Sequence, residues 1–211
     1  VINYDGSEVA AYGVCADPGG MNHAQLLEND TQALISEHGS SQIIWYNFTH
    51  HNLDKRSVVF TIGGDDGTWP IVDLKRNVTY PPGATVWSGQ HNAEYMGEGD
   101  SGHEVWMFDD NGLGNESRLL IVTVDDTVGE AYLEWEYRLG TLSTIYGDCD
   151  PTPAGNIMGS YWASKYDVKA GQQLAGIIEV TRETKEVAWH LKVYGPPCAA
   201  NSTGGVNYGN G

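Results

Sequence analysis

The sequence predicts an all-β fold, an antiparallel β-sandwich or jelly roll with one short N-terminal helix. Segments that alternate apolar and polar residues recur from residue 42 onward, separated by turn-forming residues. The chain has 27 Gly with 7 Trp and 12 Tyr, a mixture that favours strands joined by tight turns. No strand–helix–strand alternation is visible, which argues against a parallel sheet. A closed β-barrel of the lipocalin type is the alternative architecture.

The clearest predicted strand is EAYLEWEYRLG, residues 130–140. Successive side chains of a strand point to opposite faces, so its large apolar residues are expected to share the core face: Leu133, Trp135, Tyr137 and Leu139. The other face then carries Tyr132, Glu134, Glu136 and Arg138. Two carboxylates would thus lie roughly 7 Å apart along one strand.

Further strands are expected on both sides of this segment, at 42–50, 56–64, 70–80, 84–91, 103–110, 117–126, 173–182 and 186–195. The segment 117–126 is apolar on both faces, which predicts a central strand. We expect 92–102 to be a glycine-rich loop, and 141–172 to be a long loop with one short strand near 160–166.

One helix is expected, over residues 22–38. Its apolar residues fall near a helical stripe: Leu26, Leu27, Ala33, Leu34 and Ile35. Asn22 can cap the start of this helix and Gly39 can end it.

The length of 211 residues and the absence of a linker predict a single domain over 1–211, with 196–211 as a mobile tail. Lys and Arg total 11 against 28 Asp and Glu, giving a formal net charge of −17. Such a surface repels nucleic acid and anionic membranes, so neither is an expected partner. The longest apolar run, Leu119 to Val124, is too short to span a bilayer.

Five acceptor sequences for N-glycosylation indicate passage through a eukaryotic secretory pathway, at Asn29, Asn47, Asn77, Asn115 and Asn201. We therefore expect a secreted, extracellular glycoprotein. The chain begins at Val1 with no visible signal peptide, which predicts a mature form.

Three cysteines are present, so at most one can remain unpaired if a bridge forms within the chain. Cys149 and Cys198 both lie in segments rich in Pro and Gly, and we expect them to form a disulfide. Cys15 would then be buried or linked to another molecule.

The carboxylates Glu134 and Glu136 are the first catalytic candidates, because glycosidic hydrolysis uses two carboxyl groups that flank the bond. Tyr132 could contact a sugar ring, and Arg138 could hold one carboxylate ionised while its neighbour is protonated. The competing interpretation is an ordinary solvated strand face with a Glu–Arg pair.

The last predicted strand offers a second candidate set, since His190, Lys192 and Tyr194 fall on one face. His190 and Tyr194 could serve as base and acid in β-elimination from a uronic acid. The net charge opposes binding of a polyuronate, and an outward polar face is the competing interpretation.

Acidic pairs at strand ends suggest calcium as the one cofactor to consider, with Asp109 and Asp110 as ligands; turn chemistry alone also explains them. The residues His91, Glu94 and His103 bracket the glycine-rich loop and could form a metal site, although the His-x-His spacing of cupins is absent. Loop aromatics that could stack on a sugar are Trp69, Tyr161 and Trp162.

These features together favour a secreted protein whose partner is carbohydrate. The carboxylate pair favours a polysaccharide-active glycosidase, and the His/Tyr pair a polysaccharide lyase. The alternative from another class is a non-catalytic secreted binding or interaction protein, such as a lectin, an effector or a surface antigen.

Overall fold

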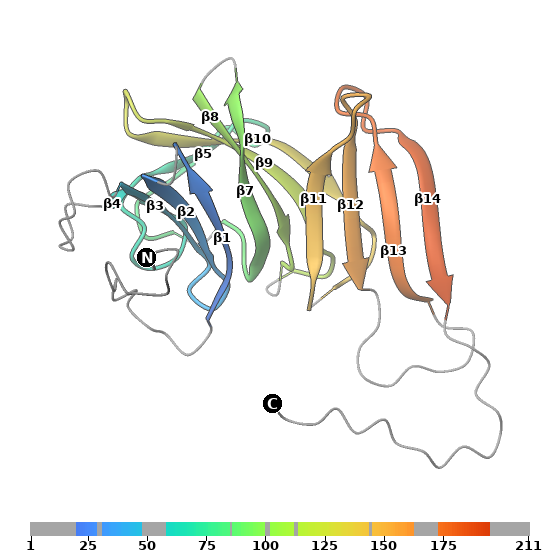
Figure 1. The fold of residues 1–211 in the computed structure, drawn as a ribbon. Helices are drawn as coiled ribbons and strands as arrows, with labels where there is room; N and C mark the ends of the chain where they lie inside the picture. The colour runs from blue at the N-terminus through green and yellow to red at the C-terminus, as the bar shows by residue number, and fades with distance from the viewer. Residues whose placement is uncertain are drawn as a thin grey trace, which may run out of the picture.

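In a computed structural model of the protein, the described residues form three β-sheets and no helix (Figure 1). The described residues are 20–28, 31–47, 58–84, 86–99, 102–111, 114–143, 145–162 and 173–194. The all-β prediction is therefore confirmed. None of the three sheets in these ranges closes on itself, so the barrel alternative is wrong. Within the same ranges, no helix is long and apolar enough to cross a membrane.

The N-terminal sheet has the order β1-β2-β3-β4 and is antiparallel. Its strands are β1 (Met21–Leu27), β2 (Gln32–Glu37), β3 (Gln42–Asn47) and β4 (Val58–Ile62). The helix predicted over 22–38 is wrong, because this segment is the hairpin formed by β1 and β2. Ala33, Leu34 and Ile35 are consecutive and all buried, and such a short apolar run fits a buried strand as well as a helix.

The central sheet has six strands in the order β6-β5-β10-β9-β8-β7. They are β5 (Ile71–Asp73), β6 (Val78–Tyr80), β7 (Gln90–Gly99), β8 (Gly102–Asp109), β9 (Arg118–Asp125) and β10 (Glu130–Arg138). β5 and β10 are parallel and the other neighbours are antiparallel, so this sheet is mixed.

The C-terminal sheet is antiparallel, with the order β11-β12-β13-β14. Its strands are β11 (Gly147–Pro151), β12 (Ile157–Trp162), β13 (Gln173–Val180) and β14 (Val187–Tyr194). The long loop predicted over 141–172 is thus wrong at β11, whereas the short strand predicted near 160–166 overlaps β12. Residues 163–172 lie outside the described residues. The loop predicted over 92–102 is also wrong, because it contains most of β7 and the first residue of β8.

The central sheet carries a hydrophobic core on each face, and each outer sheet covers one of them (Figure 1). In β9, Leu120 and Val122 pack toward the N-terminal sheet, while Leu119 and Ile121 pack toward the C-terminal sheet. The prediction of a central strand over 117–126 is confirmed. A strand covered on both faces needs apolar residues at successive positions, which is the pattern that its sequence shows.

Glycines bring the C-terminal sheet close to the central sheet. A Cβ atom on Gly159 would lie 2.6 Å from Cδ2 of Leu119, and one on Gly147 would overlap the ring of Phe108. Any larger residue at these positions would push the two sheets apart.

Cys149 lies in β11 and is a free, buried thiol that packs in the core beneath the C-terminal sheet. The predicted bridge to Cys198 is therefore wrong: the sequence suggested a loop here, whereas the side chain of Cys149 points into a packed core. Cys15, Cys198 and the tail predicted over 196–211 lie outside the described residues.

Candidate functional site

A β-bulge in β10 falls at Glu134, the first of the two carboxylates that the sequence pairs. Leu133 and Trp135 pair with adjacent residues of β9, so Glu134 is the extra residue of the bulge. Leu133 therefore packs in the core under the N-terminal sheet, and Trp135 in the core under the C-terminal sheet. The prediction that these two residues share a face is wrong, because the bulge shifts the alternation by one residue.

The same shift divides the polar residues of β10. Tyr132 precedes the bulge and Glu136 follows it, so the two side chains lie on opposite faces of the sheet. Tyr132 donates a hydrogen bond to Oε2 of Glu130 at 2.7 Å, and Arg138 donates to Oε1 of Glu116 at 2.9 Å. The predicted four-residue polar face does not form.

Glu136 is instead the centre of a buried ion-pair network. Its carboxylate oxygens lie 3.1 Å from Nζ of Lys75, 2.9 Å from Nη2 of Arg76 and 3.3 Å from Nη1 of Arg118. Burial alone would raise the pKa of Glu136, but the hydrogen bonds and charges of Lys75 and Arg76 lower it to about 2. A permanently ionised, fully paired carboxylate suits a structural role and gives no support to an acid–base role.

Glu134 and Glu136 both line a cavity of about 380 Å³, together with Lys75, Arg76 and Lys185. Nζ of Lys185 lies 5.3 Å from the centroid of the Trp135 ring, and burial and the nearby Lys75 lower the pKa of Lys185. The other carboxylates that line this cavity, Asp73 and Glu136, are each paired with a basic side chain.

His190 faces the core side of the C-terminal sheet, where its Nε2 lies 2.6 Å from Oη of Tyr161. Burial lowers the pKa of His190, and the charge of Lys192 lowers it further. The lyase prediction paired His190 with Tyr194, whereas the tyrosine that contacts His190 in the structure is Tyr161. The outward-facing residues of β14 are apolar and exposed: Trp189, Leu191 and Val193.

The three aromatic residues predicted to stack on a sugar do not come together. Trp69 packs on Phe60 with ring centroids 5.1 Å apart, at the core under the N-terminal sheet. Tyr161 is a buried residue of β12 in the other core, where a loop had been predicted, and Trp162 at the end of β12 is 39% exposed. The central sheet separates Trp69 from the other two.

Asp109 and Asp110 have separate partners, so they are not arranged as a calcium site. Oδ2 of Asp109 accepts a hydrogen bond from Nε of Arg118 at 2.8 Å, and its Oδ1 accepts from backbone N–H groups of Ser88 and Asn111. Burial raises the pKa of Asp109, against the lowering effect of Arg118. Asp110 faces two histidines, His38 and His91.

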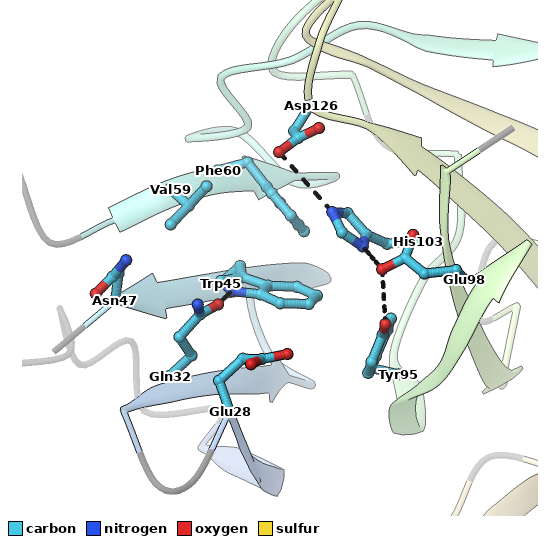
Figure 2. Close-up of a pocket in the computed structure, with 10 residues that line it drawn as sticks. All are labelled: Glu28, Gln32, Trp45, Asn47, Val59, Phe60, Tyr95, Glu98, His103 and Asp126. Carbon is cyan, nitrogen blue, oxygen red and sulfur yellow. Dashed lines mark hydrogen bonds and ion pairs between the residues drawn. The ribbon is translucent and has the colours of Figure 1, made fainter. Parts of the chain in front are cut away.

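A second pocket lies between the N-terminal sheet and the edge of the central sheet, and we call it the intersheet pocket. Figure 2 shows the residues that line it: Glu28, Gln32, Trp45, Asn47, Val59, Phe60, Tyr95, Glu98, His103 and Asp126. Its volume is about 240 Å³. The side chain of Gln25 in β1 bridges the two walls, because its amide accepts from N of Tyr95 at 2.7 Å and donates to O of Tyr95 at 3.1 Å.

Aromatic rings form the floor of the intersheet pocket. The ring centroid of Trp45 lies 5.3 Å from that of Tyr95, 5.2 Å from that of His103 and 5.6 Å from that of Phe60. Nε1 of Trp45 donates to the side-chain oxygen of Gln32, which fixes the indole ring. Figure 2 shows the ring of Trp45 between the strands of the N-terminal sheet and the polar residues of the opposite wall.

A chain of polar contacts forms the opposite wall. Oε1 of Glu98 accepts hydrogen bonds from Oη of Tyr95 and from Nδ1 of His103, each at 2.8 Å. Nε2 of His103 lies 3.8 Å from Oδ2 of Asp126. Burial, and then the hydrogen bond to Glu98, raise the pKa of Tyr95 to about 12. This tyrosine therefore remains a neutral donor at physiological pH.

The sequence did not predict most of this pocket, because the secondary structure predicted for two of its segments was wrong. Glu28 and Gln32 belong to the segment 22–38 that was predicted to be a helix, and Tyr95 and Glu98 to the segment 92–102 that was predicted to be a loop. His103 was noted as part of a metal set, but that set is dispersed. His103 contacts Glu98, whereas Glu94 contacts His23 at 3.1 Å, and His91 contacts Asp110.

The predicted glycosylation positions fall in different surroundings. Asn77, in the turn between β5 and β6, and Asn115, before β9, are exposed. Asn47 is half-buried and lines the intersheet pocket. Asn29 and Asn201 lie outside the described residues.

No protein-family model matches the chain, and no curated protein matches it as a relative.

Proposed function

We propose that the protein is a secreted glycoprotein that binds carbohydrate, and that the intersheet pocket admits one uncharged sugar unit. The observation that carries this proposal is the combination of an aromatic floor with acceptor oxygens on the walls of one small pocket. The apolar C–H face of a sugar packs on aromatic rings, and its hydroxyl groups donate to carboxylates and amides.

The acceptors are well placed for this role. Glu28 is exposed at the rim, and Glu98 is held in position by Tyr95 and His103. Carboxylates that are already oriented lose little entropy when a ligand binds. Hydroxyl donors on a sugar therefore meet, in Glu98, an acceptor that needs no rearrangement.

Charge and size restrict the ligand. The lining contains three carboxylates, Glu28, Glu98 and Asp126, and none of its described residues is Lys or Arg. Anionic sugars are therefore disfavoured, whereas neutral hexoses are not. The volume of about 240 Å³ is below the roughly 300–1,000 Å³ of drug-sized ligand sites, which fits one ring or the end of a glycan.

Binding is favoured over cleavage. A glycosidase needs one carboxyl group that can donate a proton and a second that acts as base or nucleophile. Oε1 of Glu98 already accepts two hydrogen bonds, from Tyr95 and His103. Neither Glu134 nor Glu136, the predicted catalytic pair, lines this pocket.

The test is a glycan array on the intact protein, followed by titration of the best ligand with the variants Glu28→Gln and Tyr95→Phe. Both variants change polar atoms of the pocket and keep the shape of the side chain. Glu183→Gln, in the exposed turn before β14, is the matched control for loss of one negative charge. We expect each pocket variant to weaken binding about tenfold, as for loss of one hydrogen bond to a charged group, and the control to bind as the wild type does.

Other outcomes would redirect the assignment. Release of reducing ends that Glu28→Gln abolishes would make the pocket catalytic. A quaternary ammonium ligand that binds where sugars do not would identify a cation site, because aromatic faces with carboxylates also suit cations. If the folded protein binds no glycan on the array, carbohydrate is rejected as the ligand.

A further inference from the structure

A second cluster of side chains lies where the end of β2 meets the edge of the central sheet. His38 follows β2, His91 lies in β7, and Asp110 directly follows β8. Nε2 of His38 and Nε2 of His91 lie 3.3 Å and 3.2 Å from the same oxygen, Oδ2 of Asp110. None of these residues lines the intersheet pocket.

We propose that His38, His91 and Asp110 bind a divalent transition-metal ion, with Zn²⁺ as the reference case. All three ligand atoms lie within 4.8 Å of one another. Bonds of about 2.0–2.1 Å in a tetrahedral zinc site place ligand atoms about 3.3–3.4 Å apart. The two measured distances to Asp110 already match this spacing.

Asp110 gives an independent indication of a missing partner. Its side chain is 5% exposed, and its Oδ1 has no hydrogen-bond donor among the described residues. A buried carboxylate oxygen without a donor is costly, and a cation bound to the same carboxylate would offset part of that cost.

Gly89 keeps space open next to the ligand atoms. A Cβ atom at this position would lie 3.0 Å from Nε2 of His38 and 3.4 Å from Oδ2 of Asp110. Gly89 also has a positive φ of 67°, which disfavours any larger residue.

The backbone around the cluster is held by a buried side chain. Nε2 of Gln90, next to His91, donates to the backbone oxygens of Glu37 and Gln42 at 3.0 Å and 2.8 Å. Since Glu37 precedes His38, this contact fixes the two histidines relative to each other. A site held in this way binds a metal with little loss of conformational entropy.

The donor set selects the class of metal. Two imidazoles and one carboxylate suit zinc and other late first-row ions, whereas calcium takes oxygen ligands almost exclusively. Three protein ligands leave at least one coordination position for water, as in open zinc sites. The side chain of His38 is 36% exposed, so that position faces solvent.

Metal binding has a defined consequence for Asn22. Its Nδ2 lies 3.0 Å from Nδ1 of His91, so Nδ1 is the acceptor and Nε2 carries the proton directed at Asp110. Coordination through Nε2 moves this proton to Nδ1. The amide of Asn22 must then turn its oxygen toward Nδ1, giving up its bond to O of Gln90.

The test uses the full chain, treated with EDTA and dialysed, and titrated with ZnCl₂ in a calorimeter. Titration with Co²⁺ in parallel gives visible absorption bands that report nitrogen and oxygen ligands. The variants are His38→Ala, His91→Ala and Asp110→Asn. His23→Ala is the matched control, because His23 lies in the same hairpin and contacts Glu94. A second control, His50→Ala with His51→Ala, tests the adjacent histidines outside the described residues.

We expect one Zn²⁺ per chain, at least tenfold weaker binding in each of the three variants, and unchanged binding in both controls. A zinc-dependent rise in Tm should occur in the wild type and disappear in His38→Ala. This variant is chosen because the side chain of His38 is partly exposed, so its removal should disturb folding the least. Absence of stoichiometric zinc binding would overturn the proposal. So would binding that survives His38→Ala and His91→Ala or that is lost in the His50/His51 control.

Discussion

Arg118 and Glu136 form a buried ion pair between β9 and β10, with Nη1 and Oε2 3.3 Å apart and side chains only 7% and 4% exposed. The same guanidinium donates to Asp109 through Nε at 2.8 Å. One guanidinium therefore pairs with two buried carboxylates at the end of the central sheet, and Lys75 and Arg76 supply further positive charge to Glu136.

Replacing Glu136 by Gln should lower the free energy of unfolding by about 3–5 kcal/mol, because Arg118 would lose half of its buried partners. Urea denaturation at neutral pH measures this change. Glu134→Gln is the control, since Glu134 is a bulge residue with no ion pair among the described contacts, and it should change stability by less than about 0.5 kcal/mol. A Glu136→Gln protein as stable as the wild type would show that the network is not structural.

The stability that Glu136 contributes should depend on pH in a defined window. Its pKa falls from an ordinary 4.5 to about 2 in the folded protein, so its contribution is complete above pH 4.5 and is lost as the pH falls toward 2. A shift of this size corresponds to about 3 kcal/mol. The measurement is the difference in unfolding free energy between wild type and Glu136→Gln across this range. The pH-dependent contributions of the other titratable groups are common to both proteins and cancel in this difference. A difference that does not shrink below pH 4.5 would contradict the assignment.

Cys149 should be unreactive in the folded protein. Burial raises the pKa of its thiol, and the nearby carboxylates of Asp148 and Asp150 raise it further, so almost no thiolate is present at neutral pH. In a Cys15→Ser/Cys198→Ser background, a thiol reagent should label no cysteine under native conditions and one after unfolding in urea. Rapid native labelling would contradict the burial of Cys149, and a Cys149–Cys198 peptide in the wild type would contradict its free state.

The sequence predicted those strands in which the order of apolar and polar residues follows directly from which strand faces are buried. Segments 103–110, 117–126 and 173–182 are strands, because alternation or continuous apolar character reflects one or two covered faces. The bulge at Glu134 could not be predicted, since it depends on the register of β10 against β9 and not on β10 alone. That one residue decides which side chains of β10 share a face with Glu136.

The candidate sites were less predictable for the same reason. Gly97 and Gly99 make β7 resemble a loop, although β7 forms one wall of the intersheet pocket. His38 lies 53 residues from His91 and 72 residues from Asp110 in the sequence, and only the packing of the hairpin β1–β2 against β7 brings them together. Contacts between distant segments have no local sequence signature.

The predicted secretion and the proposed sugar pocket together predict which acceptor asparagines carry glycans. In protein from a eukaryotic secretory host, Asn77 and Asn115 should carry glycans, because both are exposed. Asn47 should not, since a glycan there would stand in the intersheet pocket that we assign to an external sugar. Mass spectrometry of peptides before and after N-glycosidase treatment measures all three positions, with Asn77→Gln and Asn115→Gln as controls that each remove one glycan. A fully occupied Asn47 in a protein that still binds free sugar would place the sugar site elsewhere.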